Sequence, residues 1–397
     1  MKIAVVGSGI AGLGAAYVLS RLHEVELFER DDRPGGHTNT VSVGRHELDT
    51  GFIVHNERNY PLLTRLFREL DVETQRSEMS FSVSCGCGVE YSGRRPLRAG
   101  RLLGEIVRFL RTARDADYDG RTLAQFARAE GYSAGFSRHY LMPLTAAIWS
   151  TAPERALEFP AAAAIRFFDN HSMLGFRRRR WRAVTGGSRT YVDRLLERSG
   201  LQLRLGLGVR SLRRDPDGVE LVCADGVTRR YDAVVVATHP DQALGLLADP
   251  SDEERRLLGA FRFTANDTVL HTDERFLPRR EGSRSSWNYQ LASCTAAAQP
   301  TKPTLTYYLN RLQDLDTPEH FCVTLNRTNE IRHERIIERF SYEHPQVSFE
   351  SLAAQGELPG LNGVRRTAFA GAWHGHGFHE DGLAAGIRAA AALGVRW

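Results

Sequence analysis

Residues 2–30, KIAVVGSGIAGLGAAYVLSRLHEVELFER, hold the pattern that decides the fold. Residues 3–6 form a short apolar run, which is typical of a buried parallel strand. Residues 7–12 then fit G-x-G-x-x-G, and residues 11–22 are small or apolar at helical spacing. The segment EVELF predicts a second strand that ends at Glu29. The order of strand, glycine loop, helix, strand and acid indicates a dinucleotide-binding β–α–β unit.

Each glycine of this loop has a physical reason. Gly7 makes the tight turn, Gly9 lets a pyrophosphate approach the backbone, and Gly12 lets helix and strand pack closely. The first helical turn then offers unpaired N–H groups and a positive dipole end to phosphate. Glu29 lies twenty residues after Gly9, where an acid accepts hydrogen bonds from ribose hydroxyls. Because this carboxylate would repel a 2′-phosphate, NADP is disfavoured. We also expect the backbone torsions of Gly9 to exclude a β-branched residue.

The bulk composition allows a large globular protein. The chain has 397 residues, 42% of them hydrophobic and 25% charged, which favours two or three domains. A net charge of +4 argues against nucleic acid as a partner. No apolar run is long enough to span a membrane, and the strand pattern begins at residue 3 without a preceding signal peptide. We therefore expect a cytoplasmic protein. Peripheral membrane contact and the oligomeric state stay open.

Five cysteines are present, an odd number in a long chain, so a disulfide framework is not expected. Cys85 and Cys87 are separated by a single glycine. No second pair follows at the spacing of common zinc sites. We therefore expect ordinary thiols at these two positions rather than metal ligands.

Residues 33–40, RPGGHTNT, follow the second strand and resemble the R-x-G-G-R-x-x-[ST] motif of the flavin-dependent amine oxidase superfamily. This superfamily includes amine oxidases, phytoene-type desaturases and protoporphyrinogen oxidase. His37 stands where arginine is usual, and histidine can still donate a hydrogen bond there. Residues 47–52, ELDTGF, resemble the superfamily's D-x-G segment along the flavin side of the cofactor. The resemblance implies FAD. We expect it to be non-covalent, because no cysteine lies near the expected attachment region.

Two later segments resemble the remaining flavin motifs. Residues 233–237 form an apolar strand followed by Thr238 and His239, where A-T-G is usual. Residues 367–370 form a short strand that precedes a glycine-rich loop, an acid–glycine pair and an alanine-rich helix. The resemblance implies that this helix points its N-terminus at the flavin and stabilises negative charge on the reduced ring. The loop GAWHGHGFHEDG is then expected to wall the flavin rather than bind a metal through its three histidines.

The residues expected to contact FAD come from all of these segments. They are Gly7, Gly9, Ile10, Ala11, Gly12, Glu29, Arg30, Gly35, Gly36, His37, Thr38, Thr50, Gly51, Phe52, Val209, Ala237, Thr238, Gly371, Ala372, Asp381, Gly382 and Leu383. Candidate acid–base groups are His55, His376 and His379, which sit in or beside flavin-lining segments, although each also fits a structural histidine. No second G-x-G-x-x-G follows a strand, so we expect no nicotinamide domain. Oxygen, a quinone or a carrier would then reoxidise the flavin.

The expected fold class is α/β, with a discontinuous, glutathione-reductase-like Rossmann-type FAD-binding domain and an inserted α+β substrate domain. The FAD-binding domain is assigned residues 1–75, 185–245 and 360–397, and the substrate domain residues 76–184 and 246–359. Helical spacing predicts helices within residues 100–175, and short apolar runs predict strands within residues 260–330. Helices over one face of such a sheet would enclose a deep apolar pocket, ending at the flavin near Trp373 and Phe378.

Longer segments, among them WRAVTGGSRTYVDRL and GHGFHEDG, are similar to a bacterial NAD/FAD-binding-protein branch of the superfamily. Members of this branch accompany cyclopropane-fatty-acid-synthase-like methyltransferases. The resemblance implies hydride removal from an apolar substrate, with desaturation of a methylated fatty acyl chain foremost. An amine oxidase, a redox-neutral flavin isomerase and a non-catalytic flavin-binding partner of a lipid methyltransferase stay open.

Two further features bear on this choice. Many amine oxidases of the superfamily place a lysine near the flavin, and Lys302 is the only candidate, at a spacing that looks short. The basic run at residues 177–180 is either a solvated loop or a contact for an anionic headgroup at the pocket mouth.

Overall fold

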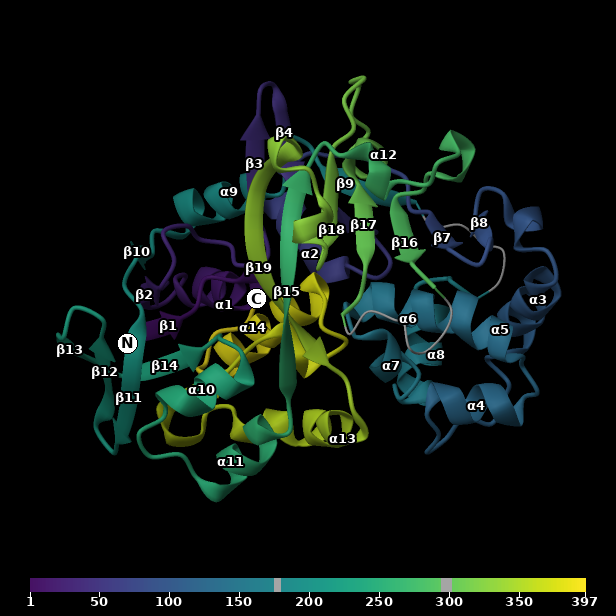
Figure 1. Ribbon diagram of the computed structural model, residues 1–397. Coiled ribbons are helices and arrows are strands. Elements are labelled where there is room, and N and C mark those ends of the chain that lie inside the picture. Colours follow the sequence, from purple (N-terminus) through teal and green to yellow (C-terminus); the bar gives the residue numbers. More distant parts are fainter. Residues whose placement is uncertain (175–179, 294–301) are drawn as a thin grey trace.

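The computed structural model describes residues 1–174, 180–293 and 302–397, and Figure 1 shows their arrangement. The parallel strands near the N-terminus lie at one side of the molecule and most of the inserted helices at the other. Residues 177–179 of the basic run, together with Cys294, fall outside the described residues. The headgroup contact expected of that run therefore stays a prediction.

The first lobe, called the Rossmann lobe below, is built on a five-stranded parallel sheet in the order β10-β2-β1-β14-β20. Its strands are β1 (Lys2–Val6), β2 (Glu24–Phe28), β10 (Gln202–Arg204), β14 (Ala233–Val236) and β20 (Thr367–Phe369). Ile3 and Val5 are buried in one apolar core, and Ala4 and Val6 in another. Burial on both faces explains why the inner strands β1 and β14 are almost entirely apolar. The predicted Rossmann-type α/β fold is confirmed.

Helices cover one face of this sheet. They are α1 (Ile10–Leu19), α2 (Pro61–Glu69), α9 (Arg189–Ser199) and α14 (His379–Ala392). Small residues let α1 and α14 approach closely, since a Cβ on Gly386 would lie 2.2 Å from the carbonyl oxygen of Ala11. The opposite face is covered by a meander and three helices. These are β11 (Val209–Asp215), β12 (Gly218–Cys223), β13 (Thr228–Tyr231), α10 (Pro240–Leu246), α11 (Asp252–Gly259) and α13 (Phe349–Glu357).

The inserted lobe combines a seven-stranded mixed sheet with a layer of helices, seen at the right of Figure 1. The sheet runs in the order β19 (Ile336–Gln346), β15 (Arg262–His271), β18 (Cys322–Leu325), β17 (Leu305–Tyr308), β16 (Trp287–Leu291), β7 (Phe81–Cys85) and β8 (Glu90–Ser92). The helices are α3 (Leu102–Thr112), α4 (Leu123–Ala129), α5 (Ala134–Phe136), α6 (Met142–Trp149), α7 (Pro153–Ala156) and α8 (Ala161–Asn170), and a short α12 (Leu309–Leu312) follows β17. Aromatic and aliphatic side chains form an apolar core between helices and sheet.

The sequence patterns do not predict β19, although it pairs with β15 along its whole length. Its sequence, IIERFSYEHPQ, mixes charged residues with a proline near its end. Such a composition is tolerated because β19 is an edge strand whose residues are mostly only partly buried. The missing prediction matters, because this strand carries side chains that reach the cavity described below.

Two small sheets complete the fold. β3 (Thr40–Val43) pairs with β4 (His46–Asp49), and β9 (Trp181–Val184) lies between β5 (Val54–His55) and β6 (Thr74–Ser77). β9 belongs to the range assigned to the substrate domain, yet it pairs with β5, which lies within residues 1–75, and with β6, which crosses the boundary at residue 75. The two lobes are therefore joined by strand pairing at this point. None of the helices in the described ranges has the length and apolar character needed to cross a bilayer.

Candidate functional site

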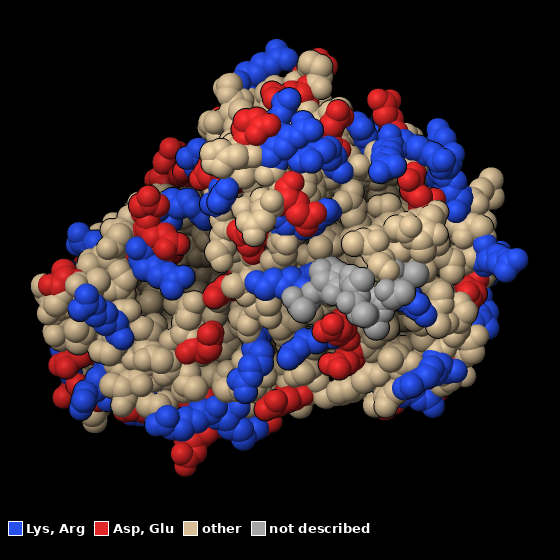
Figure 2. Space-filling model, viewed as in Figure 1, with Lys and Arg blue, Asp and Glu red and all other residues tan. Residues whose placement is uncertain are grey.

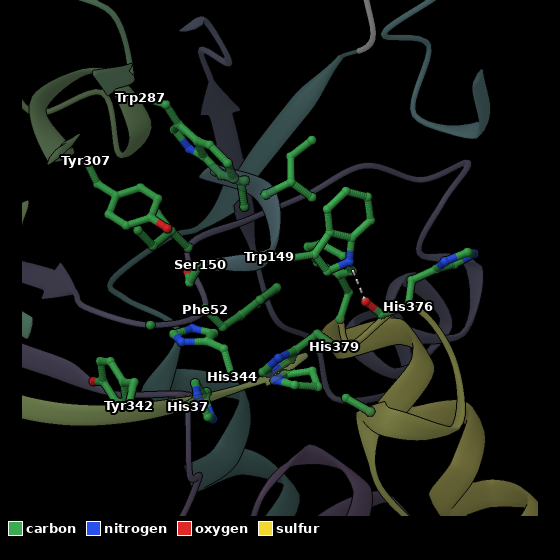
Figure 3. A pocket seen from close by; sticks show the side chains of 18 of the residues that line it. His37, Phe52, Trp149, Ser150, Trp287, Tyr307, Tyr342, His344, His376 and His379 are labelled. Atoms are coloured by element: carbon green, nitrogen blue, oxygen red, sulfur yellow. Dashed lines mark hydrogen bonds between the residues drawn. The ribbon is translucent and has the colours of Figure 1, made fainter. Parts of the chain in front are cut away.

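A cavity of about 2020 Å³ extends from the glycine loop after β1 into the inserted lobe. Side chains from both lobes line it, as Figure 3 shows. On the face seen in Figure 2 the surface is hollowed near β1 and α1, with basic and acidic side chains mixed around the hollow. Sites for one small ligand usually occupy about 300–1,000 Å³. The cavity therefore has room for two ligands in contact.

The glycine loop forms one end of the cavity. Gly7 has a φ of +98°, and a Cβ there would lie 2.8 Å from the carbonyl oxygen of Ala237, so this turn requires glycine. Gly9 is different, with φ −65° and ψ 174°, torsions that any L-residue adopts. The expectation that its torsions exclude a β-branched residue is therefore wrong. An added Cβ at Gly9 would meet nothing within 4 Å, so the feature that sets Gly9 apart is the open space beside it.

The first turn of α1 faces the open space beside Gly9. No side chain caps the helix, and first-turn N–H groups have no intrahelical partners. Ile10 and Ala11 of that turn lie on the cavity wall. An uncapped helix N-terminus beside an open glycine is suited to a phosphate group.

Glu29 lies beside the same loop, at the end of β2. Its Oε2 accepts hydrogen bonds from the backbone N–H of Ser8 at 2.9 Å and from the Ser8 hydroxyl at 2.6 Å. Its Oε1 accepts from the backbone N–H of Asp31 at 3.0 Å. These three donors fix the carboxylate on the cavity wall, and its remaining lone pairs are available to hydroxyl groups of a ligand.

The residues predicted to contact the cofactor divide into two sets. Those on the cavity wall are Gly7, Gly9, Ile10, Ala11, Glu29, Arg30, Gly36, His37, Gly51, Phe52, Val209, Ala237, Thr238, Gly371 and Ala372. Those behind the wall are Gly12, Gly35, Thr38, Thr50, Asp381, Gly382 and Leu383. The second set packs the elements that carry the first. A Cβ on Gly382, for example, would lie 2.8 Å from the side chain of Ile10.

The histidine-rich loop 371–378 is held by hydrogen bonds to its main chain. Gln355 donates to the carbonyl oxygens of Trp373 at 2.8 Å and Gly375 at 2.7 Å. The Asp381 carboxylate accepts from the backbone N–H of Phe378 at 3.0 Å and so caps α14. Trp373 lines the cavity but is 3% exposed, and its indole N–H donates to the Thr238 carbonyl at 3.2 Å. The loop is therefore a fixed wall.

His374, His376 and His379 do not form a metal site among the described residues, because their ligand atoms do not gather at one point. His374 is largely buried, which lowers its pKa to about 3. The backbone carbonyl of His376 accepts from the Trp149 indole at 3.2 Å, and its ring points away from His379 in Figure 3.

His379 is held most firmly of the three. Its Nε2 lies 2.9 Å from both the Thr38 hydroxyl and the Tyr191 hydroxyl, and its ring stacks on Phe52 with centroids 3.9 Å apart. Burial lowers the pKa of its ring to about 3, and the His55 ring adds to the effect. The ring is therefore neutral at pH 7. His55 itself is 2% exposed and does not line the cavity, because its ring packs edge-on against Phe67. The structure thus does not bring His55 to the site.

A second aromatic group faces the cavity from β19 and was not predicted. His37 stacks on Tyr342 with centroids 5.1 Å apart, and His344 lies edge-on to His37 at 5.5 Å. Burial lowers the pKa of His344 to about 4 and that of His37 well below its usual value, and nearby histidines lower both further. His37 stands where the superfamily motif has arginine, and here it is a neutral ring. The pairing of β19 with β15 and the hydrogen bonds that join the Tyr342 hydroxyl to Asn39 and Thr50 bring these residues together.

The far end of the cavity lies in the inserted lobe and is apolar. Helices α3, α6 and α8 contribute no charged side chain to its wall, only Leu103, Ile106, Val107, Leu110, Leu144, Ile148, Trp149 and Phe167. Strands add Phe81, Trp287 and Tyr307, and Phe378 stacks on Phe167 at 4.9 Å. Helical periodicity predicted these helices. It cannot tell a residue that faces a cavity from one that faces a packed core.

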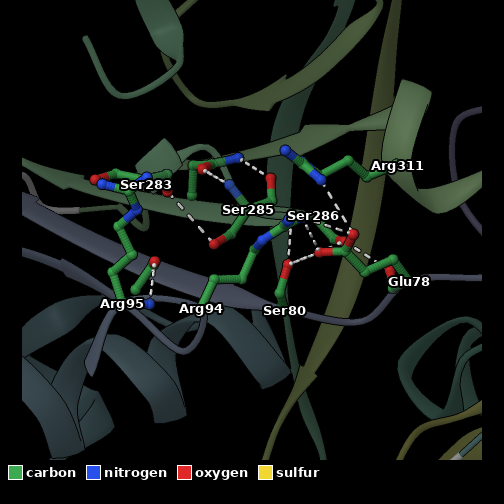
Figure 4. Close-up of polar contacts among 10 residues, drawn as sticks. Glu78, Ser80, Arg94, Arg95, Ser283, Ser285, Ser286 and Arg311 are labelled. Carbon is green, nitrogen blue, oxygen red and sulfur yellow. Dashed lines mark hydrogen bonds and ion pairs between the residues drawn. The ribbon is translucent and has the colours of Figure 1, made fainter. Parts of the chain in front are cut away.

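A polar group borders the apolar end, as shown in Figure 4. Arg94 donates to both carboxylate oxygens of Glu78, at 3.1 and 2.9 Å, and Arg311 donates to Glu78 at 3.0 Å. Burial opposes ionisation of Glu78, but the Ser80 hydroxyl and the two guanidiniums hold its pKa below the usual value. All four side chains line the cavity, and the buried Nε of Arg311 has no hydrogen-bond partner among the described residues.

Over residues 10–394 the chain matches the family described as flavin containing amine oxidoreductase. The chain belongs to this family. It is a flavin-dependent oxidoreductase, and the predicted membership of the amine oxidase superfamily is confirmed. The open space at Gly9, the uncapped α1 and the fixed Glu29 all fit a flavin dinucleotide.

Individual relatives of this flavoprotein differ in what they act on. A segment of 69 residues is 41% identical to an L-amino-acid oxidase of Pseudechis australis, covering 17% of this chain and 13% of that oxidase. A CLA-producing fatty acid isomerase from P. acnes has a similar structure, with a TM-score of 0.70 and 15% identity over 97% of this chain and 96% of that chain. A cyclohexylamine oxidase from Brevibacterium oxydans also has a similar structure, with a TM-score of 0.69 and 16% identity over 99% of this chain and 98% of that chain. At such identities the structural likeness shows a shared fold.

The two lysines of this flavoprotein both lie away from the cavity. Lys302, the candidate for an amine-oxidase lysine, is exposed and donates to the carbonyl oxygen of Ala265 at 3.0 Å. It borders a separate, small surface hollow with Asp267 and Asn326. The cavity wall therefore holds no lysine.

Proposed function

We propose that the flavin is FAD and that it is bound non-covalently along the Rossmann lobe. The space beside Gly9 supports a pyrophosphate there, and the Glu29 carboxylate supports a ribose. No cysteine of the described ranges lines the cavity, which speaks against a thioether link. The protein should purify yellow, and acid precipitation should release the flavin into the supernatant. A yellow pellet under a clear supernatant would contradict non-covalent binding.

We further propose that the substrate is a long acyl chain and that the reaction is its desaturation. The observation that carries this proposal is the apolar end of the cavity, where α3, α6 and α8 present only hydrocarbon and aromatic side chains. An ammonium substrate would need an acid, a carbonyl group or a closed aromatic cage to replace its lost hydration, and the wall that α3 contributes is aliphatic and offers none of these. A hydrocarbon chain has no such need, and its burial is favourable.

The chemistry is the conversion of two adjacent CH₂ groups into a double bond. One carbon loses a hydride, its neighbour loses a proton, and the remaining electron pair forms the second bond between them. When bound, the flavin supplies the two-electron acceptor, and oxygen, a quinone or a protein carrier takes up those electrons afterwards. The walls contributed by this chain hold the reacting C–H bonds in one orientation and exclude water.

The Arg94–Glu78–Arg311 group supports an anionic end on the substrate. Two guanidiniums share one carboxylate, so the group carries a net positive charge beside the apolar space. The unpartnered Nε of Arg311 offers a further donor. A carboxylate or phosphate at the end of an acyl chain matches both features. This proposal is separate from the headgroup contact expected of residues 177–180, which stays a prediction.

Of the three histidines considered as acid–base groups, His379 is retained in this proposal. The Thr38 and Tyr191 hydroxyls hold its Nε2 on the cavity wall, and its low pKa keeps the ring neutral and makes it a weak base, so its contribution would come from its position. His379→Gln should lower kcat by roughly 100-fold or more, the usual range for a lost acid–base group, while flavin stays bound. His376→Gln is the matched control and should change kcat little. Equal losses in both variants would remove His379 from this role.

The substrate proposal is tested by anaerobic bleaching of the flavin. Free and phospholipid-bound acyl chains, with and without a methyl branch, should reduce the flavin, and added salt should weaken their binding. The methylated chains are included because of the resemblance to the methyltransferase-associated branch. Arg94→Gln combined with Arg311→Gln should raise the acyl-chain concentration needed for half-maximal bleaching by roughly tenfold, because about one charged hydrogen bond to the substrate would be lost. Bleaching by simple amines but not by any acyl lipid would reject the desaturase in favour of an amine oxidase.

A redox-neutral isomerase is the second candidate, favoured by the fold shared with a fatty acid isomerase. In that case a double bond would move along the chain without net use of an electron acceptor. The two reactions are separated by measuring acceptor consumption together with product structure. No turnover with any of these substrates would support a non-catalytic flavin-binding partner of a lipid methyltransferase.

We also propose that residues 94–111 contact a membrane surface. This segment contains six arginines and only one acid, Glu105, and Leu97 is 82% exposed. Its inner side chains, Leu103 and Ile106 among them, line the cavity. Cationic and apolar groups together favour an anionic bilayer. Binding to phosphatidylglycerol vesicles should fall with salt and with Leu97→Asp, and salt-independent or absent binding would reject the contact.

A further inference from the structure

Two cysteines and a histidine meet on the inserted lobe, outside the cavity. Cys85 ends β7 and is buried, and Cys87 lies exposed in the turn that leads to β8. The turn is tight, since the Gly88 N–H donates to the Cys85 carbonyl at 2.9 Å and the Cys85 N–H to the Val89 carbonyl at 2.8 Å. Both thiols are thereby held on one rigid hairpin.

His139 reaches this hairpin from a distant segment. It lies in a π-helical turn, Ser137–Leu141, which precedes α6 and in which one extra residue per turn redirects side chains. Its Nδ1 lies 3.2 Å from the Gly135 carbonyl oxygen, and the Tyr91 hydroxyl donates to the His139 carbonyl at 2.6 Å. A carbonyl acceptor at Nδ1 holds the proton on that nitrogen. Nε2 then keeps its lone pair and faces Cys87 Sγ at 3.4 Å.

The geometry matches a tetrahedral metal. The thiol sulfurs of Cys85 and Cys87 and the ring nitrogen of His139 all lie within 4.8 Å of one another. Zinc binds sulfur at about 2.3 Å and imidazole nitrogen at about 2.1 Å, which at a tetrahedral angle separates the two ligands by about 3.6 Å. The observed separation of 3.4 Å between Cys87 and His139 needs only a small side-chain movement to meet this value.

We propose that Cys85, Cys87 and His139 form a binding site for a thiophilic divalent cation, with zinc as the favoured ion. Two sulfurs and one imidazole select zinc over magnesium or calcium, which prefer oxygen ligands. The exposed position of Cys87 leaves the fourth coordination position accessible to water. This site departs from the sequence expectation of ordinary thiols. The third ligand is 52 residues away along the chain, a spacing that no common zinc pattern contains.

The site would fasten the β7–β8 hairpin to the helical layer. Tyr91 and Tyr140, neighbours of these ligands, both line the cavity, and Phe81 begins β7. A metal joining the hairpin to the turn before α6 would therefore stabilise the apolar wall without touching the flavin. Its role is structural, and it does not depend on which substrate the enzyme uses.

The test uses the full-length protein and two metals. After loading with zinc and desalting, metal analysis should give one zinc per chain. Replacement by Co²⁺ should give the intense near-ultraviolet absorption of thiolate-to-cobalt charge transfer and the visible bands of a tetrahedral ion. Cys87→Ser and His139→Gln should each weaken zinc binding by at least tenfold in competition with a coloured chelator. Cys223→Ser, a buried thiol of the Rossmann lobe, is the matched control and should bind zinc like the unaltered protein.

Flavin content distinguishes loss of metal from loss of folding. Cys87 is exposed, so Cys87→Ser should fold and keep its flavin, and chelation should lower the Tm of the unaltered protein but not that of the variant. Absence of zinc after loading, together with no cobalt spectrum, would overturn the proposal and leave a thiol–imidazole hydrogen bond. Zinc retained by both ligand variants at unchanged affinity would also overturn it.

Discussion

The two ends of the cavity are built from different parts of the chain. At the Rossmann end part of the wall is main chain, contributed by glycines such as Gly7, Gly9 and Gly371. At the inserted end the wall consists of side chains on helices and strands, among them Ile148 and Trp287. The first kind of wall depends on a few glycines at fixed spacing. The second depends on the shapes of many side chains, each of which can change independently.

This difference separates the two proposed ligands, FAD and an acyl chain, as well. A dinucleotide needs backbone N–H groups and an acid at set distances, so its site allows little variation. A hydrocarbon chain needs only volume and the absence of unpaired polar groups. Within one fold, the cofactor end can therefore stay the same while the inserted end accepts amines, lipids or other substrates. Substitutions at the two ends should accordingly affect flavin binding and substrate binding separately.

The largest effect is expected at the Rossmann end. Gly9→Val should abolish flavin retention, because its side chain would fill the space beside the α1 N-terminus. The torsions of Gly9 are open to valine, so the protein should still fold. Flavin absorbance per chain after desalting measures the effect, and circular dichroism reports the fold. A folded variant that keeps one flavin per chain would count against the glycine loop as the phosphate site.

At the inserted end, Ile148→Trp should block the substrate and spare the flavin. Ile148 lies on α6 and faces the cavity, so an indole there would occupy space needed by an acyl chain. We expect kcat/KM to fall by roughly 10- to 100-fold, about the cost of a steric mismatch in an apolar pocket. Val227→Trp, on an exposed turn, is the control for adding an indole. Equal loss of flavin and activity in the Ile148 variant would show that the two ends are not independent.

The same contrast explains what the sequence predicted. The glycine loop, Glu29 and strands β1 and β2 follow from local spacing, because a β–α–β unit places them through neighbouring residues. His344 was not predicted, because it reaches the cavity only through the long-range pairing of β19 with β15. His55 was expected beside the flavin from its position after the D-x-G segment, but its ring turns into the core against Phe67. Sequence spacing fixes where the backbone goes, and the direction of a side chain depends on distant packing.

A smaller effect is expected from Glu29. Glu29→Ala removes a carboxylate that Ser8 and Asp31 hold in place. A hydrogen bond to a charged group contributes about 1.5–3 kcal/mol, so flavin affinity should weaken by roughly 10- to 100-fold. Titration of the flavin-free protein gives the dissociation constant. Glu29→Gln is the control, because it keeps one acceptor oxygen and should lose less. An unchanged dissociation constant in both variants would mean that the ribose lies elsewhere.

The smallest effect concerns pH. Burial lowers the folded-state pKa of His344 to about 4, from an ordinary value of 6.5. Its neutral ring therefore contributes stability that is fully present above pH 6.5 and is lost as pH falls from 6.5 toward 4, where the unfolded chain binds a proton and the folded one does not. The slope for one proton is about 1.4 kcal/mol per pH unit, so the Tm should fall between pH 7.5 and pH 5. His344→Gln keeps an acceptor for the Asn266 side chain, which now donates to His344 Nδ1 at 3.0 Å. Between pH 7.5 and pH 5 the Tm of this variant should fall by about 2 °C less than that of the unaltered protein. The difference is small because a given change in free energy shifts the Tm less in a chain of this length. Thermal melts at matched ionic strength measure the difference. Parallel curves of Tm against pH for the two proteins would show that His344 titrates normally and that the cavity wall formed by His37 and His344 is open to water.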